Sequence, residues 1–180
     1  MSGTVGLQLI ALSAIAACRI DLDHHNYSDA DGTQGSGRVC GVSSAPAASC
    51  TAASGHMELS WIQTNILTPK CALSDSCHTN VHPQNDLDLS TAAKSYTLLV
   101  NATSQLDTAR KLVVPGDVNA SLLAAIIGVI KVSEASPPMA ALPKGLNGAD
   151  VGTMPYNAQT MCCEKADAIS AWIAAGAPNN

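Results

Sequence analysis

A short segment of the chain holds two cysteines and a histidine in an order that can attach a haem. Cys71 and Cys77 are separated by five residues, and His78 follows Cys77 directly. Each thiol can add to a vinyl group of a haem, and the neighbouring neutral imidazole can then ligate the iron. The usual attachment motif has two residues between the cysteines, so the wider spacing lowers the specificity of this match. The segment predicts a covalent haem site with His78 as an iron ligand.

Four chemical outcomes remain open for this segment. Both thiols can bond to haem if the small polar residues 74–76 loop out, or Cys77 alone can be bonded. Alternatively, Cys71 and Cys77 form a disulfide and no haem is present, since the short loop is sterically permissible. A zinc site would add His82 to the same three residues, although their spacing matches no common zinc pattern. We expect His82 to be a solvated loop residue rather than a ligand.

A second iron ligand is expected from a methionine in the C-terminal part of the chain. Met154 precedes Pro155, which fixes the backbone direction beside it. A thioether is a soft donor that favours ferrous iron and raises the reduction potential. Met139 is the rival and Met161 the third choice, because a lone methionine ordinarily fills space in a core. We predict that His78 and Met154 form the ligand pair.

Helices are the elements that must position these residues. Apolar residues recur at helical spacing over residues 59–67, and Pro69 is expected to end or bend this helix just before the first cysteine of the motif. Ser90 is expected to cap a second helix over residues 91–100, and a third helix is predicted over residues 121–127.

The last helix is predicted to begin near Cys163 and to be stopped by Gly176 and Pro178. Its expected buried face consists of Ala166, Ile169, Trp172 and Ile173. Residues 134–155 are rich in proline and glycine and are predicted to be loop. Strand-like alternation is absent from the sequence, so we predict an all-α fold of about four helices with long irregular loops.

Five segments resemble, in the same order, a bacterial family of mono-haem cytochrome c domains of the planctomycete or myxobacterial type. They are residues 61–71, 87–90, 113–123, 152–155 and 168–179. The first resembles the entry helix of the family, the fourth the loop that donates the axial methionine, and the last the closing helix. The chain departs from the family in the wide spacing between Cys71 and Cys77.

The resemblance implies a cytochrome c-like domain over residues 57–180 that binds one covalent haem c. Cys71 and Cys77 would attach the haem, and His78 and Met154 would ligate the iron. With both axial positions filled, no open site remains for oxygen or peroxide chemistry, which implies an electron carrier rather than an enzyme. The alternative is a haem-free surface lipoprotein with a Cys71–Cys77 disulfide, acting as a binding or structural module.

The N-terminus resembles an export signal. Residues 5–17 form an apolar run that is too short to span a bilayer comfortably and leads to Cys18, in a pattern similar to a bacterial lipobox. Residues 1–18 are therefore predicted to be a lipoprotein signal peptide, with Cys18 as the lipidated residue, although no lysine or arginine precedes it. We expect the protein to be exported and lipid-anchored to the inner or outer membrane, facing the periplasm or the cell exterior.

Residues 19–56 are predicted to be a flexible tether. Serine, glycine, alanine and aspartate dominate this segment, which has too few large apolar residues to offset the entropy of ordering it. Cys40 and Cys50 could close a small disulfide loop within it. Cys162 and Cys163 could pair with a tether cysteine or with each other, and the sequence does not choose among these pairings.

The composition narrows the choice of partners. Charged residues make up 13% of the chain, the net charge is −5, and no lysine or arginine cluster is present, which argues against nucleic-acid binding. The acidic balance predicts a transient redox partner with a basic or weakly charged surface. Aromatic residues are scarce, with three Tyr, two Trp and no Phe, which is compatible with a cofactor that supplies ring surface to the core.

Overall fold

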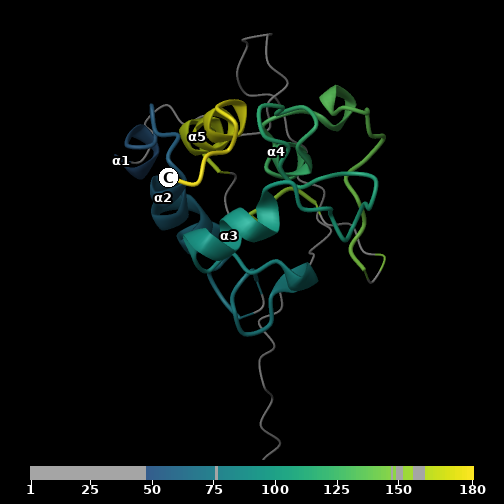
Figure 1. The fold of residues 1–180 in the computed structure, drawn as a ribbon, viewed down its shortest axis with the longest axis horizontal. Helices are drawn as coiled ribbons and strands as arrows, with labels where there is room; N and C mark the ends of the chain where they lie inside the picture. The colour runs from purple at the N-terminus through teal and green to yellow at the C-terminus, as the bar shows by residue number, and fades with distance from the viewer. Residues whose placement is uncertain (1–47, 76, 147, 149–151, 156–160) are drawn as a thin grey trace, which may run out of the picture.

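The computed structural model describes residues 48–75, 77–146, 148, 152–155 and 161–180, and this part of the chain is helical (Figure 1). Its α-helices are α1 (Ala48–Thr51), α2 (Leu59–Ile62), α3 (Ala92–Leu99), α4 (Leu122–Ile126) and α5 (Cys163–Ala174). Its other helices are the π-helix η1 (Gln63–Cys71) and the 3-10 helices η2 (Gln84–Asp86) and η3 (Val132–Glu134). Within the described residues there is no β-strand, only isolated bridges. The prediction of an all-α fold is confirmed, with five α-helices where about four were expected.

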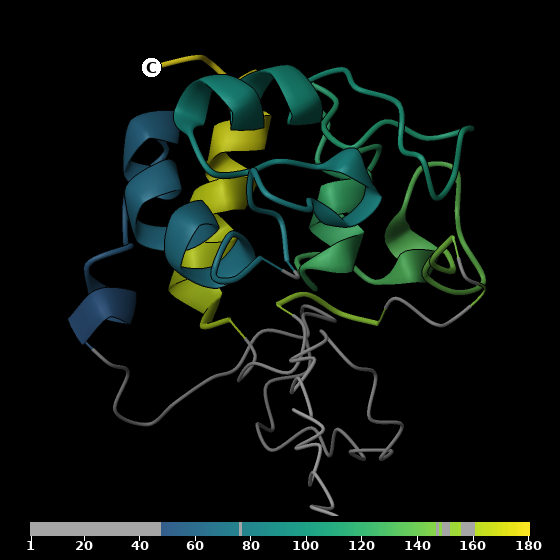
Figure 2. The ribbon, with the colours of Figure 1, turned by 90° about the horizontal axis from the view of Figure 1, so that it is seen from below.

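Helix α5 is central to the packing. It contacts α1 and α2, and α2 in turn contacts α3. Figures 1 and 2 both place α5 between the N-terminal helices and α4. Its predicted apolar face is confirmed as core, since none of the four residues exposes more than 2% of its surface: Ala166, Ile169, Trp172 and Ile173.

The end of α5 follows the sequence signal at Gly176. The Gly176 backbone is in the left-handed region (φ 92°), which glycine adopts without a steric penalty. The N–H groups of Gly176 and Ala177 donate to the carbonyls of Ile173 (3.0 Å) and Trp172 (2.9 Å), the Schellman pattern that satisfies the last carbonyls of a helix. The Trp172 indole N–H donates to the Pro178 carbonyl at 2.9 Å, so this buried polar atom also has a partner.

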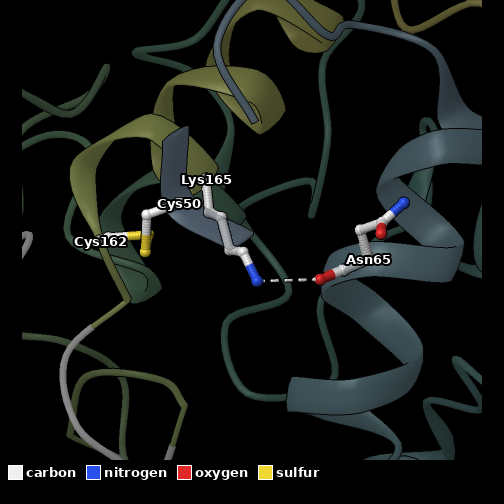
Figure 3. The surroundings of a disulfide bond; sticks show 4 residues. All are labelled: Cys50, Asn65, Cys162 and Lys165. Atoms are coloured by element: carbon white, nitrogen blue, oxygen red, sulfur yellow. Dashed lines mark hydrogen bonds between the residues drawn. A yellow bond between two sulfur atoms is a disulfide. The ribbon is translucent and has the colours of Figure 1, made fainter. Parts of the chain in front are cut away.

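The first long helix does not end before Cys71, contrary to the prediction. Helix α2 passes directly into η1, which contains Pro69 and reaches Cys71. In an α-helix, proline lacks the N–H that would bond the carbonyl four residues earlier, and its ring clashes with that carbonyl. In the wider π-helix, each N–H bonds the carbonyl five residues earlier instead. The Asn65 carbonyl, which residue 69 would bond in an α-helix, accepts a hydrogen bond from Lys165 Nζ at 3.2 Å (Figure 3). Cys71 therefore lies at the end of a continuous helix.

The N-terminus of α3 lies slightly later than predicted. Thr91, rather than Ser90, is the N-cap, and its hydroxyl accepts a hydrogen bond from the Lys94 N–H at 3.4 Å. The Ser90 N–H donates to the Asp88 carboxylate at 2.9 Å instead, and Lys94 Nζ donates to the same carboxylate at 2.6 Å. Asp88 therefore holds Ser90 in the turn before the helix.

The folded chain begins before Met57, the predicted domain boundary. Helix α1 and the buried Ala53 (1% exposed) belong to the segment predicted to be a tether. Cys50 forms a disulfide with Cys162, with a Cα–Cα distance of 6.1 Å (Figure 3). The possible pairing of Cys50 with Cys40 is therefore wrong, and the open alternative, in which Cys162 or Cys163 pairs with a cysteine of the predicted tether, is confirmed. Helix α1 has no buried residue, and the covalent bond ties it to the start of α5, a connection that composition could not reveal.

Removal of the Cys50–Cys162 disulfide is expected to lower the free energy of unfolding by about 2–5 kcal/mol. The bond joins residues separated by 112 positions, and a long cross-link restricts the unfolded chain strongly. Wild type and the Cys50→Ser/Cys162→Ser variant should be compared by urea denaturation. Reductant should be left out, because Cys163 is also disulfide-bonded and its bond must stay intact in both proteins. Equal unfolding midpoints in the two proteins would contradict this prediction.

The predicted export signal and most of the predicted tether lie outside the described residues. This applies to Cys18, the predicted lipidation site, and to Cys40. Within the described part of the chain, no helix combines the length and apolar character needed to cross a bilayer.

Candidate functional site

A cavity of about 570 Å³ lies within the domain. It is lined by the end of η1, the loop before α3, the end of α3, residues 102–106, α4 and residues 154–155. Most of the wall is aliphatic and includes Leu87, Leu99, Leu112, Leu123, Ile126 and Ile127. The volume falls within the range of about 300–1,000 Å³ that is typical of pockets for small molecules and cofactors.

The four residues predicted to bind the cofactor all line this cavity: Cys71, Cys77, His78 and Met154. Three of them belong to the short segment of residues 71–78, whereas Met154 comes from a distant part of the chain. Each of the four is half-buried. The fold therefore brings two thiols, an imidazole and a thioether to one apolar space.

The rival ligands do not line the cavity. Met139 is half-buried and packs against the core, and Met161 is a core residue with 6% of its surface exposed. Met57 is also elsewhere, with 45% of its surface exposed, so Met154 is the only methionine among the described residues that lines the cavity. His82 is exposed and lies outside the cavity lining, as expected for a loop residue.

The His78 ring is held by the loop that precedes α3. Its Nδ1 lies 3.1 Å from the Leu87 carbonyl, so a proton on Nδ1 leaves Nε2 as the acceptor atom. The backbone carbonyl of His78 accepts a hydrogen bond from the Leu89 N–H at 2.8 Å. Burial lowers the pKa of His78 and outweighs the hydrogen bond to Leu87, which acts in the opposite direction. The ring is therefore held in the neutral form that ligates metals.

The segment that holds the two cysteines and His78 is closed by backbone hydrogen bonds. The His78 N–H donates to the Cys71 carbonyl at 3.0 Å, and the Cys77 N–H donates to the Ser74 carbonyl at 2.9 Å. Between the cysteines, residues 73–75 are exposed, with 73% of the Leu73 surface accessible. Residues 73–75 are thus exposed to solvent, and Leu73 lines the cavity together with both cysteines.

Both Cys71 and Cys77 carry thiols in the structure, so the disulfide considered from the sequence is not formed. Burial, together with a smaller contribution from the nearby Cys77, raises the pKa of the Cys71 thiol to about 12. Cys71 is therefore protonated at neutral pH.

Met154 is held by the end of α4. Its backbone N–H donates to the Ile126 carbonyl at 2.8 Å. The last carbonyls of a helix have no partner within the helix, and the Met154 N–H fills that role for the Ile126 carbonyl of α4. Because Ile126 and Ile127 also line the cavity, this bond fixes the methionine beside the apolar wall.

The zinc site considered from the sequence is not assembled in the described residues. Cys71, Cys77 and His78 do not form a group whose ligand atoms all lie within 4.8 Å of one another. In the described chain only Cys50, Cys162 and Glu164 meet that criterion, and the two sulfurs there are joined in a disulfide. Disulfide sulfurs lack the thiolate charge that zinc requires.

Sequence reasoning missed Gln63, a buried polar residue that supports the loop around His78. Gln63 exposes 6% of its surface and donates a hydrogen bond to the Leu89 carbonyl at 2.8 Å. The signal was present, because Gln63 occupies the i+4 position of the apolar face that starts at Leu59. A polar residue on such a face requires a buried hydrogen-bond partner.

Asp88 is expected to stabilise the fold in a pH-dependent way. Burial alone would raise the pKa of its carboxyl, but hydrogen bonds from Lys94 and Ser90 outweigh this and lower the pKa to about 2. Because the folded pKa is depressed, the contribution is present above pH 3.8, the ordinary value, and is lost as pH falls through 2. The difference in unfolding free energy between wild type and Asp88→Asn should therefore be larger at pH 7 than at pH 2. A difference that does not change with pH would contradict this expectation.

The site is thus an apolar cavity that presents two thiols, a neutral imidazole and a thioether. Comparisons of the chain with protein-family models, with curated proteins and with solved structures found no match. Its function must therefore be inferred from the residues of the site.

Proposed function

We propose that the chain is a one-electron carrier that binds one covalent haem c in this cavity, with His78 and Met154 as the iron ligands. The observation that carries the proposal is the gathering of Cys71, Cys77, His78 and Met154 around one apolar cavity. A cytochrome c-like arrangement accounts for all four, because it uses two thiols for attachment and an imidazole and a thioether as ligands.

The residues of the cavity fit a haem in size and chemistry. The space of about 570 Å³ has an aliphatic wall, and no Trp or Tyr of the described residues lines it. A large apolar macrocycle would supply the ring surface that the few aromatic residues of the chain do not. Exposed polar residues of the lining, including Lys70, Gln84 and Gln105, could donate hydrogen bonds to the carboxylates of a haem.

We further propose that both cysteines are attached despite their wide spacing. Residues 73–75 are exposed, so they can accommodate the additional residues between the two cysteines. The hydrogen bond from the His78 N–H to the Cys71 carbonyl closes the segment. A single attachment through Cys77 would leave the Cys71 thiol in the cavity beside the bound group.

The proposed ligand set favours electron transfer over catalysis. A bound haem supplies a metal that changes oxidation state by one electron. Because His78 and Met154 would both ligate the iron, the protein would leave no ligand position for oxygen or peroxide. The net charge of −5 suits a transient partner with a basic surface. Lipid attachment at Cys18 would hold the carrier at a bacterial membrane facing the periplasm or exterior.

The proposal is tested by producing the full chain with and without a cytochrome c maturation system. We expect a haem-stained band on a denaturing gel and a mass increment of one haem only in the presence of that system. A reduced-minus-oxidised spectrum should show c-type bands. A colourless protein without the mass increment would refute the proposal and favour the haem-free binding or structural lipoprotein.

A further inference from the structure

We infer that Gln63 is a positioning residue for His78: its amide fixes residues 87–89, which in turn orient the imidazole in the cavity. The inference rests on the proposed function, because it concerns the ligand of that site. Gln63 belongs to η1, the helix that ends at Cys71, so it links the attachment segment to the loop that holds the ligand.

The Gln63 amide uses both of its polar atoms in buried or half-buried hydrogen bonds. Its Nε2 donates to the Leu89 carbonyl at 2.8 Å and to the Thr68 hydroxyl at 2.9 Å. Its Oε1 accepts a hydrogen bond from the hydroxyl of Ser95, which is fully buried, at 2.7 Å. These bonds join η1, α3 and the loop between them, and they leave the amide no alternative orientation with equal bonding.

The segment that Gln63 holds contacts His78 at two points. The Leu89 N–H donates to the His78 carbonyl at 2.8 Å, and the Leu87 carbonyl lies 3.1 Å from His78 Nδ1. Leu89 exposes only 3% of its surface, so water does not readily replace these bonds. Gln63 therefore acts on the imidazole through the peptide groups of residues 87–89. Partners of this kind orient a ligating histidine and tune its basicity.

Gln63→Met tests the inference, because it keeps the side-chain length and removes the amide. Ser121→Ala is the matched control, since Ser121 is also buried (1% exposed) and its hydroxyl bonds only the segment from Val114 to Asp117. In the full chain made without haem, we expect the Leu89 N–H to exchange with deuterium about tenfold faster in Gln63→Met, as for the loss of one buried hydrogen bond. Core amides of α5 should change equally little in both variants.

In the haem-loaded protein, Gln63→Met should shift the midpoint potential, whereas Ser121→Ala should leave it at the wild-type value. Unchanged exchange at Leu89 in Gln63→Met overturns the inference, whether or not the chain binds haem. If Gln63→Met does not fold, Ser95→Ala removes one anchor of the same amide and should accelerate Leu89 exchange by a smaller factor. No acceleration in Ser95→Ala would then overturn it. Absence of haem in wild type would refute the proposed function alone.

Discussion

Replacement of His78 by alanine is expected to abolish stable haem binding. His78 is the half-buried imidazole that lines the same cavity as both thiols, and burial favours its neutral, ligating form. Without this imidazole the iron would lose its proposed nitrogen ligand. Folded protein with covalently attached haem and a c-type spectrum should therefore not accumulate. The haem-stained fraction of purified protein and its visible spectrum measure this effect.

His82→Ala is the matched control for this substitution. His82 lies four residues further along the chain, but it is exposed and does not line the cavity. Its removal should leave haem content and spectrum at wild-type levels. If His82→Ala rather than His78→Ala removes the haem, the assignment of the imidazole ligand is wrong.

Replacement of Met154 by alanine is expected to leave the haem attached but to lower its midpoint potential. A thioether stabilises the ferrous state, so its loss should shift the potential by a substantial part of the roughly 0.8 V range that axial ligands set. The open axial position should also bind added imidazole or carbon monoxide, which wild type should bind poorly. Potentiometric titration and ligand-binding spectra measure the two effects.

Met139→Ala serves as the comparison for Met154→Ala. Met139 is also half-buried and follows two prolines, but it packs on the core rather than lining the cavity. The potential of Met139→Ala should remain close to that of wild type. A large drop in Met139→Ala with none in Met154→Ala would show that the sixth ligand has been misassigned.

Both proposed ligands are held in part by main-chain groups of neighbouring segments. Residues 87–89 hold His78 at its ring and its carbonyl, and the Ile126 carbonyl holds the backbone of Met154. Main-chain groups cost little conformational freedom to order once the helices are packed. Such bonds place both side chains at the cavity before any cofactor is present, which reduces the cost of binding.

The sequence by itself determined the helical class and the last helix, and it named four candidate residues that the fold places around one cavity. The apolar period of α5 and the glycine at its end are local signals, since one helix face and one left-handed residue depend on neighbouring positions alone. The chemistry of Cys71, Cys77 and His78 could also be read locally. Met154 came from its place in a Met-Pro segment and from the resemblance to a family rather than from any local rule.

Only the tertiary structure decided how distant segments meet. The Cys50–Cys162 disulfide joins α1 to the start of α5, although the two cysteines are 112 positions apart in the sequence. Composition cannot reveal a pairing of that kind. Lys165 lies a hundred positions from Asn65 and donates a hydrogen bond to the Asn65 carbonyl, to which Pro69 cannot donate. The helix that contains both Asn65 and Pro69 continues to Cys71. The cavity likewise exists only because α4 and residues 154–155 line the same space as Cys71, Cys77 and His78. These features depend on contacts between residues far apart in sequence, which local propensities do not encode.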